Sequence, residues 1–568
     1  MESLSTWDSI GTIVGDASTS EFSFILKSFR SRVGDLVAVP MEIPNEDYTD
    51  RSNIIAWGRI TSIDRYNPFF PYEAAQELAN ESISLVDTVL SNSRDQLQAR
   101  VLVLGFTWAE ETGRLDLFPL TYPIPPAADV RYPPAEAIRE LLAGGLEGQT
   151  QLPIGTLIAR SDVPVAISAE RVVARHMAIL AMTGGGKAVA ARRILRELID
   201  QGYPLVIFDP HGDYIGLWEK RDLFPDTQVR LFYPHLVMAE ENRAIVETLI
   251  AKMTEGLTEP QFEFMHAVMA QEAPEAGESV IGYIRRLLGH VERQIGSQSA
   301  NSGPHRRPTM LATRRALNLV VAQLAKMESS NKRLRQLHPS LKFEQLPDPH
   351  EQPEEIVAPS QVSILYLGGY DHLTQSTIVS LLMEALFAHR AELSDRIAPF
   401  LSVVEEAHNF IPSGREGTDD TPSLATLRKV VTEGRKFGVG LMLVTQRPSR
   451  VDETILAQCN SFLVLRLVNP KDQAFVRSVM ENLSESDARM LPGFGPGQGL
   501  ISGQAVRFPL LVRIKFDKDL LSSRTQDEDF IRQAAQWKPD GKANVRKRVA
   551  AAADKLTRFK RGKRRKPN

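Results

Sequence analysis

The segment Ala181-Met-Thr-Gly-Gly-Gly-Lys187 combines three glycines with a lysine at the spacing of a phosphate-binding loop. Glycine allows tight turns, so that successive backbone N–H groups can point at one anion. The N-terminus of a following helix would add its dipole, and Lys187 would add a positive charge near the outer phosphates of a nucleotide. The residues predicted to bind nucleotide here are Thr183, Gly184, Gly185, Gly186, Lys187, Ala188 and Val189.

Two positions of this segment depart from the P-loop pattern G-x-x-x-x-G-K-[ST]. Ala181 replaces the first glycine, which is a mild change, and Ala188 replaces the hydroxyl residue that should bind Mg²⁺. Because alanine has no oxygen to offer a metal, we expect poor ATP hydrolysis. The alanine is either an inactivating substitution that traps one state or the mark of a naturally weakened ATPase, and the otherwise intact motifs favour the first. Taken alone, the segment could also be a glycine-rich turn with a surface lysine.

A second candidate site follows the apolar run 399–404, which ends in two adjacent carboxylates, Glu405 and Glu406. This is the Walker B arrangement. Glu405 is expected to bind Mg²⁺ through its water shell, and Glu406 is expected to act as general base on the attacking water. Paired acids at a strand end can also form a solvated turn. The apolar run, the upstream glycine-rich segment and the following Ala407-His408 argue against that alternative.

Two further polar residues follow apolar runs. Asp209 ends the run 204–208, and an acid at the carboxyl end of a parallel strand points into the crevice where such sheets bind ligands. It could orient water or metal in a nucleotide pocket, or it could cap a helix. Gln446 follows the run 439–444 and could sense the γ-phosphate through the attacking water, or it could form a turn.

The elements that must position these residues follow from hydrophobic periodicity. A buried strand is expected at residues 177–181, and a helix at 188–199 with Ile194, Leu195, Leu198 and Ile199 on one face. Alternation of such elements along the chain predicts an α/β fold whose parallel strands bring their carboxyl ends to one edge. The other expected elements are strands at 204–208, 362–367, 399–404, 439–444 and 461–466 and a helix at 374–389.

The first 130 residues or so are β-rich in pattern, with a helical interruption at residues 73–91, and suggest a small barrel. A proline-rich linker is expected at 122–134, and a helical insertion follows the first core strands. The expected barrel strands are 11–15, 21–26, 35–39, 54–63 and 98–106. The predicted domains are 1–150 (barrel and linker), 151–239 (first part of the core), 240–345 (helical insertion), 346–520 (second part of the core) and 521–568 (a C-terminal segment with a basic tail).

Composition limits the class of protein. Charged residues make up 24% and apolar residues 43% of the 568 residues, as in soluble globular proteins. Without a long apolar run or a signal peptide we expect a cytoplasmic protein with no membrane partner. A single cysteine, Cys459, excludes an intrachain disulfide. Residues 546–566 hold 11 Lys or Arg against one acid in a chain of net charge −3. Arg546, Lys547 and Arg548 of this tail are predicted to bind DNA, although a solvated tail is an equal alternative.

Five ordered motifs together resemble the HerA family of the HerA–FtsK P-loop ATPases. They are 180–187, 208–214, 404–410, 433–437 and 444–448. The resemblance implies a RecA-like core, an N-terminal domain similar to the family's HAS barrel, and a homohexamer that uses ATP and Mg²⁺ to translocate on double-stranded DNA. It also implies a partner, either a NurA-type nuclease in DNA end processing or another effector enzyme in antiviral defence.

The resemblance also assigns roles to single residues. Lys187 would bind the β- and γ-phosphates, and Arg435 would be an arginine finger that enters the neighbouring subunit's site. Arg175 would be a second phosphate-facing arginine, or else a surface charge, and Asp209 would lie at the nucleotide pocket. Independently of the resemblance, Arg415 is predicted to grip DNA, because its polar loop 413–423 follows the paired acids and could move with nucleotide state; a charged surface loop is the alternative. Two other readings stay open: a P-loop regulatory ring that controls a partner enzyme without translocation, which Ala188 supports, and a purely structural DNA-binding ring.

Overall fold

The computed structural model describes residues 6–27, 30–44, 51–66, 96–109, 115–236, 244–254, 256–275, 278–297, 306–392, 396–414, 421–480 and 483–520. The chain forms two compact units, Met1–Asp519 and Leu520–Asn568. All that follows concerns the first unit, which contains the predicted boundaries at 150, 239 and 345. The predicted helix 73–91, Arg415, and Arg546, Lys547 and Arg548 lie outside the described residues.

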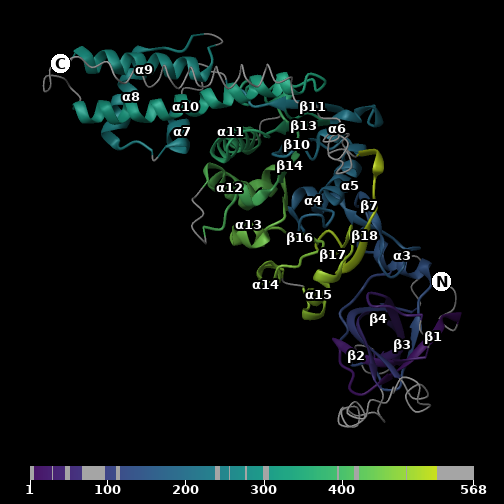
Figure 1. Cartoon of the computed structure of the whole chain (residues 1–568). Coiled ribbons are helices and arrows are strands. Elements are labelled where there is room, and N and C mark those ends of the chain that lie inside the picture. The colour runs from purple at the N-terminus through teal and green to yellow at the C-terminus, as the bar shows by residue number, and fades with distance from the viewer. Residues whose placement is uncertain are drawn as a thin grey trace, which may run out of the picture. The chain divides into compact units, whose positions relative to one another are not determined.

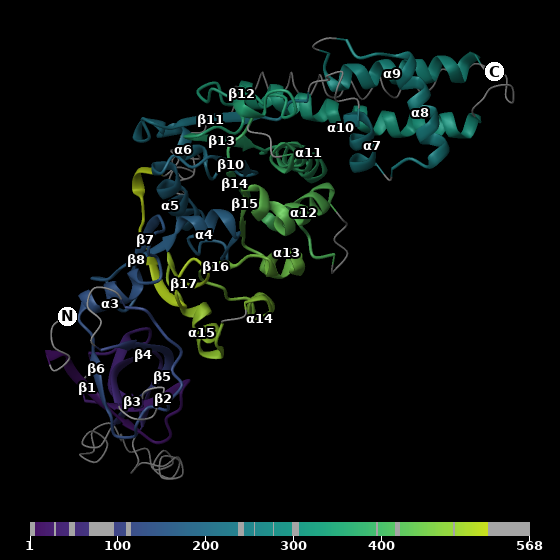
Figure 2. The same cartoon turned by 180° about the vertical axis from the view of Figure 1, so that it is seen from behind.

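The N-terminal strands close into a six-stranded antiparallel barrel, in the order β1-β2-β5-β4-β3-β6, which Figure 2 shows as a ring. Its core includes Phe24, Ala56 and Val101, which are fully buried. The barrel strands are β1 (Asp8–Val14), β2 (Glu21–Leu26), β3 (Leu36–Pro44), β4 (Arg51–Tyr66), β5 (Gln96–Trp108) and β6 (Asp129–Tyr132). The predicted barrel is therefore confirmed.

One strand of the barrel was not predicted. β6 pairs with β1 and with β3 and so completes the ring, although it lies in the stretch expected to be a linker. Val130 of β6 is fully buried, and upstream of it Ile124 also packs into the barrel. The linker prediction is wrong here because prolines on both sides conceal a strand of only four residues.

The core is built on a twelve-stranded sheet, parallel from β12 to β16 and antiparallel beyond. The central strands β10, β14, β15 and β9 are buried along their whole length, as parallel strands covered on both faces should be. In sheet order the strands are β12 (Glu344–Gln345), β11 (Gln228–Tyr233), β13 (Gln361–Tyr366), β10 (Leu205–Asp209), β14 (Phe400–Glu405), β15 (Val439–Thr445), β9 (Met177–Leu180), β16 (Ser461–Val464), β17 (Gln498–Gly503), β18 (Leu510–Ile514), β7 (Gln151–Leu157) and β8 (Pro164–Ser168).

Helices connect and cover these strands. α5 packs against β9, β15 and β7, and α12 packs against β15 and α11. The helices of the core are α3 (Ala135–Ala143), α4 (Ala169–Ala174), α5 (Lys187–Asp200), α6 (Ile215–Glu219), α11 (His372–Ala391), α12 (Pro422–Phe437), α13 (Glu453–Ala457), α14 (Pro470–Val479) and α15 (Glu485–Met490). The predicted α/β fold with a P-loop core is thus confirmed.

A helical insertion lies between β11 and β12 in the chain, as the periodicity predicted. Its longest helix, α10, packs against the other three (Figure 1). The bounds are α7 (Ala244–Met253), α8 (Glu259–Gln271), α9 (Val280–Ser297) and α10 (Arg307–Leu337). Within the described residues, no helix is long and apolar enough to span a membrane.

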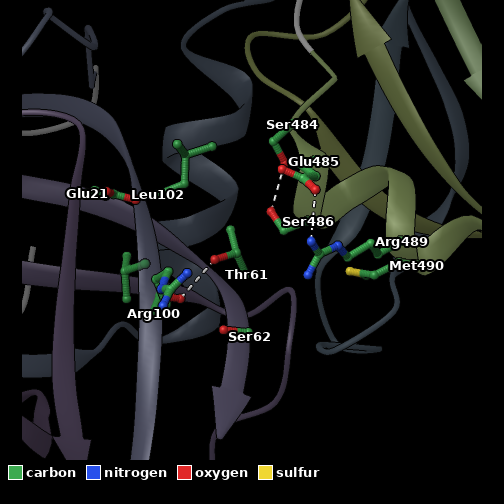
Figure 3. Close-up of a pocket in the computed structure, with 11 residues that line it drawn as sticks. Glu21, Thr61, Ser62, Arg100, Leu102, Ser484, Glu485, Ser486, Arg489 and Met490 are labelled. Carbon is green, nitrogen blue, oxygen red and sulfur yellow. Dashed lines mark hydrogen bonds and ion pairs between the residues drawn. The ribbon is translucent and has the colours of Figure 1, made fainter. Parts of the chain in front are cut away.

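A buried ion pair joins the barrel to the core. Arg59 of β4 and Asp487 of α15 approach to 2.7 Å through both guanidinium–carboxylate contacts, and each side chain is only 1% exposed. Beside this pair lies a pocket of about 460 Å³, with Thr61 and Arg100 on the barrel side and Ser484, Ser486 and Arg489 on the α15 side (Figure 3).

Candidate nucleotide-binding site

Four neighbouring strands bring the predicted site residues to one edge of the sheet. β10, β14, β15 and β9 lie side by side and run parallel. Their carboxyl ends lead to Asp209, to Glu405 and Glu406, to Gln446 and to the glycine-rich loop, respectively. Residues more than two hundred positions apart therefore meet, as the α/β fold requires.

The glycine-rich loop has a geometry that suits a phosphate. Gly184 and Gly186 have φ values of +77° and +94°, in the left-handed region that favours glycine. A Cβ atom at Gly186 would lie 3.0 Å from the backbone nitrogen of Gly497. α5 starts directly at Lys187 without a side-chain cap, so its first N–H groups can bind an anion. Val189 and Ala188 lie in the first turn of α5, and Ala188 has no hydroxyl.

Lys187 lies between the two carboxylates of β14. Its Nζ atom is 2.6 Å from Oε1 of Glu405 and 2.7 Å from Oε1 of Glu406, and its side chain is 11% exposed. Burial opposes the positive charge, but the two carboxylates outweigh it and raise the pKa of Lys187 above its ordinary value. The contact joins the Walker A and Walker B residues directly, and a bound phosphate would compete with the carboxylates for the lysine.

Glu405 is held from its other side by Tyr214. The tyrosine hydroxyl donates a 2.7 Å hydrogen bond to Oε2 of Glu405, and both side chains are fully buried. Burial raises the pKa of Glu405 to about 7, against the opposing charge of Lys187 and the hydrogen bonds from Lys187 and Tyr214. Sequence reasoning did not assign Tyr214 a role, although it is the last residue of the motif 208–214.

Glu406 is held in an uncommon backbone conformation, with φ at +52°. Its Oε2 atom lies 3.3 Å from Nδ1 of His408, which also lies 3.1 Å from Oγ1 of Thr445. Burial lowers the pKa of His408 to about 4, so the ring is neutral at pH 7. The imidazole therefore adds no charge beside Glu406.

Asp209 is fully buried, and backbone amides surround its carboxylate. Its carboxylate accepts hydrogen bonds from four successive backbone N–H groups, those of residues 211–214, at 2.6 to 3.2 Å. Burial raises its pKa to about 6, and those amides oppose the shift. Asp209 therefore stabilises the turn that leads into α6 and does not cap that helix, whose N-cap Tyr214 has no side-chain cap, and this turn positions Tyr214.

Gln446 lies next to the glycine-rich loop, where its side-chain oxygen accepts a hydrogen bond from the hydroxyl of Thr183. No group of three or more His, Cys, Asp or Glu side chains suitable for a metal occurs in the described part of the chain.

Arg175 and Arg435 lie near the amino ends of these strands, away from the glycine-rich loop. Arg175 immediately precedes β9 and donates a 2.5 Å hydrogen bond to Gln504, whereas Arg435 is exposed in the last turn of α12, just before β15. β9 and β15 are paired in register, so both arginines lie about 13 Å or more from the glycine-rich loop, at ~3.3 Å per strand residue. Neither can face the phosphates bound by its own chain in this conformation.

A glycine-rich loop between a buried parallel strand and an uncapped helix, with its lysine against a Walker B pair, defines a P-loop ATPase core. The family described as "Helicase HerA, central domain" matches residues 152–386. The HerA double-strand break repair helicase of Pyrococcus furiosus is 28% identical over 66% of this chain and 71% of its own length, and that of Saccharolobus solfataricus is 27% identical over 93% and 95%. These matches confirm the predicted resemblance to the HerA family.

One further relative and two solved structures are also similar to this chain. A probable helicase of Methanocaldococcus jannaschii is 26% identical over 92% of this chain and 94% of its own length. The structure of VirB4 from Thermoanaerobacter pseudethanolicus is 14% identical and covers 66% of this chain and 98% of that chain, with a TM-score of 0.45. The structure of the bacterial conjugative coupling protein TrwB is 13% identical and covers 69% of this chain and 94% of that chain, with a TM-score of 0.45.

Proposed function

We propose that this protein is an ATP-driven translocase on double-stranded DNA that works as a homohexameric ring. One observation carries the proposal: the nucleotide-binding groups lie at the carboxyl ends of the parallel strands, and the candidate arginine fingers lie at the amino ends of the same strands. Lys187, Glu405 and Glu406 lie at the carboxyl edge, and Arg175 and Arg435 at the amino edge. A site that combines both sets requires a second copy of the chain.

Such a division of groups couples hydrolysis to assembly. Phosphoryl transfer depends mostly on positioning and charge stabilisation, and an arginine supplied by a neighbour is worth about 10³- to 10⁵-fold in rate. In the proposed ring, Arg435 of one subunit completes the next subunit's site, and Arg175 lies at the same interface. Hydrolysis then passes from subunit to subunit and moves DNA without reading its sequence.

Within one subunit, the described residues fit ATP. The backbone N–H groups from Gly184 to Lys187 would hold the β- and γ-phosphates, and Lys187 would turn from the carboxylates to them. Glu406 would take a proton from the attacking water, which Gln446 would orient. Glu405 would hold the water shell of Mg²⁺, which when bound neutralises charge on the phosphates. Ala188 offers the metal no oxygen, so the proposed ATPase is slow.

The proposed substrate and partners follow from the family. The HerA relatives are named as DNA double-strand break repair helicases. We infer that this protein acts on double-stranded DNA together with a NurA-type nuclease in end processing, or with another effector enzyme in antiviral defence. Arg415 and the tail residues Arg546, Lys547 and Arg548 remain proposed DNA contacts outside the described residues.

A second candidate function is a nucleotide-binding ring that regulates a partner enzyme without moving along DNA. Ala188 favours it, as does the contact of Lys187 with both catalytic carboxylates, because a site that binds ATP and hydrolyses it poorly can act as a switch.

The Ala188→Thr variant separates the two candidates. A translocase restored in this way should hydrolyse ATP at least ~10-fold faster than the parent, a change of about 1.4 kcal/mol in the barrier, and double-stranded DNA should stimulate it. Native mass spectrometry with DNA and nucleotide should detect six copies. An Ala188→Thr protein that binds ATP but shows no DNA-stimulated hydrolysis would support the regulatory ring instead.

A further inference from the structure

α10 carries a row of basic residues along its exposed side, interrupted by the exposed Leu319. Arg315, Lys326 and Arg333 are separated by 11 and 7 residues, so at 3.6 residues per turn they fall within about 20° of one another around the helix axis. All three are exposed. Three more cations flank this row on one side. The three residues of the row and the three flanking residues are together called the α10 basic face. These flanking residues are Arg307, Arg314 and Lys332.

The opposite face of α10 packs into the helical insertion. Leu317, Val320 and Leu324 are almost fully buried there and lie about 140–160° or more around the helix from the row. Packing therefore fixes which side of α10 faces outward. The only acid in the helix, Glu328, lies about 140° from Arg315 but only about 40° from Arg314 and Lys332, so it borders the flanking cations and is not part of the row.

Some acids of the insertion pair with other cations. Arg286 of α9 contacts Glu272, Glu275 and Glu278 within 3.7 Å. Among the described residues, by contrast, no carboxylate lies within ion-pair distance of Arg315, Lys326 or Arg333. Asp371 shares a pocket of about 510 Å³ with Lys326, but its carboxylate caps α11 by accepting from Thr374 N at 2.9 Å.

We propose that the α10 basic face binds the phosphate backbone of double-stranded DNA. The inference rests on the proposed function and adds to it a contact surface outside the nucleotide-binding core. The row from Arg315 to Arg333 is about 27 Å long at 1.5 Å per residue. Three aligned cations with no acid in their row, on a protein of net charge −3, are complementary to a polyanion.

The test replaces Arg315, Lys326 and Arg333 together by glutamine in the full-length protein. Glutamine keeps helix propensity and length but removes charge. If the three cations each neutralise a phosphate, the slope of log K against log [salt] for a DNA duplex becomes shallower by up to ~2.7, from ~0.9 per phosphate. Affinity for a fluorescent ATP analogue should not change, because none of the three residues lies at the nucleotide site.

The matched control removes three exposed lysines that lie apart on the core, Lys220, Lys342 and Lys515. It changes net charge equally, so a general field effect would flatten the salt dependence in both proteins. An unchanged slope of log K against log [salt] in the α10 variant, or an equal change of that slope in the control, overturns the inference. The proposed function stays intact in either case, provided that the parent protein binds DNA. A loss of oligomers in native mass spectrometry with an unchanged slope would show instead that this face binds another copy. A parent protein that binds no DNA would refute both proposals.

Discussion

Replacing Tyr214 by phenylalanine removes one oxygen from the nucleotide site and tests how Glu405 is held. The hydroxyl donates at 2.7 Å to a carboxylate that is fully buried, so no water replaces it without rearrangement. A hydrogen bond to a charged group is worth about 1.5–3 kcal/mol, and one to a neutral group about 0.5–1.5 kcal/mol. We therefore expect the substitution to destabilise the protein by an amount that depends on the ionisation of Glu405.

The pH dependence follows from the raised pKa of Glu405, about 7 in the folded protein. Because the unfolded value lies near 4.5, the folded state binds more protons between the two values, and the contribution of Glu405 to stability falls as the pH rises from about 4.5 to about 7. Tyr214→Phe should raise the pKa of Glu405 further and so extend this fall to higher pH. Its cost should be about 1.5–3 kcal/mol near pH 8.5, or roughly 2–4 °C in Tm for a core of this size, and at most half of that near pH 5.5.

The assay is thermal unfolding of the parent and the variant at both pH values. Tyr203→Phe is the matched control: Tyr203 is also largely buried, but its hydroxyl makes no hydrogen bond to any described residue, so its cost should not change with pH. Equal costs for Tyr214→Phe at the two pH values, or a cost no larger than that of the control, would refute the argument that this hydroxyl stabilises an ionised Glu405.

Three further predictions concern the loop, the interface and the tail. Gly186→Ala should abolish ATP binding in a fluorescence titration, because alanine is strained at φ +94° and its Cβ would meet Gly497 at 3.0 Å; unchanged binding would contradict the assigned loop geometry. In the Ala188→Thr background, Arg435→Ala should abolish hydrolysis but keep nucleotide binding, and mixing it with Glu406→Gln subunits should restore part of the activity; no recovery in confirmed mixed rings would exclude action between subunits. Deleting residues 546–568 should weaken DNA binding and flatten its salt dependence, while DNA-stimulated hydrolysis survives at saturating DNA; its loss there would assign the tail a role in coupling.

The parts of the fold that sequence could predict are those with long apolar runs. The strands that became β9, β10, β14 and β15 are entirely buried, so each is an uninterrupted apolar segment with its functional residue directly after it. Short or half-exposed elements gave no such signal. β6 has four residues among prolines, and β17 and β18 pair antiparallel at the side of the sheet beyond β16.

Contacts inside the site could be predicted only in part. Parallel strands place Lys187 near Glu405 and Glu406, and the family motifs identify all three. The local sequence does not indicate that the carboxylate of Asp209 accepts hydrogen bonds from backbone amides. It also does not indicate that the hydroxyl of Tyr214 binds Glu405, 191 positions away. Those contacts depend on how a turn folds back over the sheet, which periodicity does not encode.

The order of strands in the sheet has a consequence for synthesis of the protein. β9 precedes both of its neighbours, β15 and β16, and the nearer begins 259 positions after Leu180. At about 5–20 residues per second, a ribosome needs roughly 13–52 s to make that length. The barrel, by contrast, has all six strands within its first 132 residues and can close at once. During translation β9 therefore lacks both of its strand partners for longer than any strand of the barrel does.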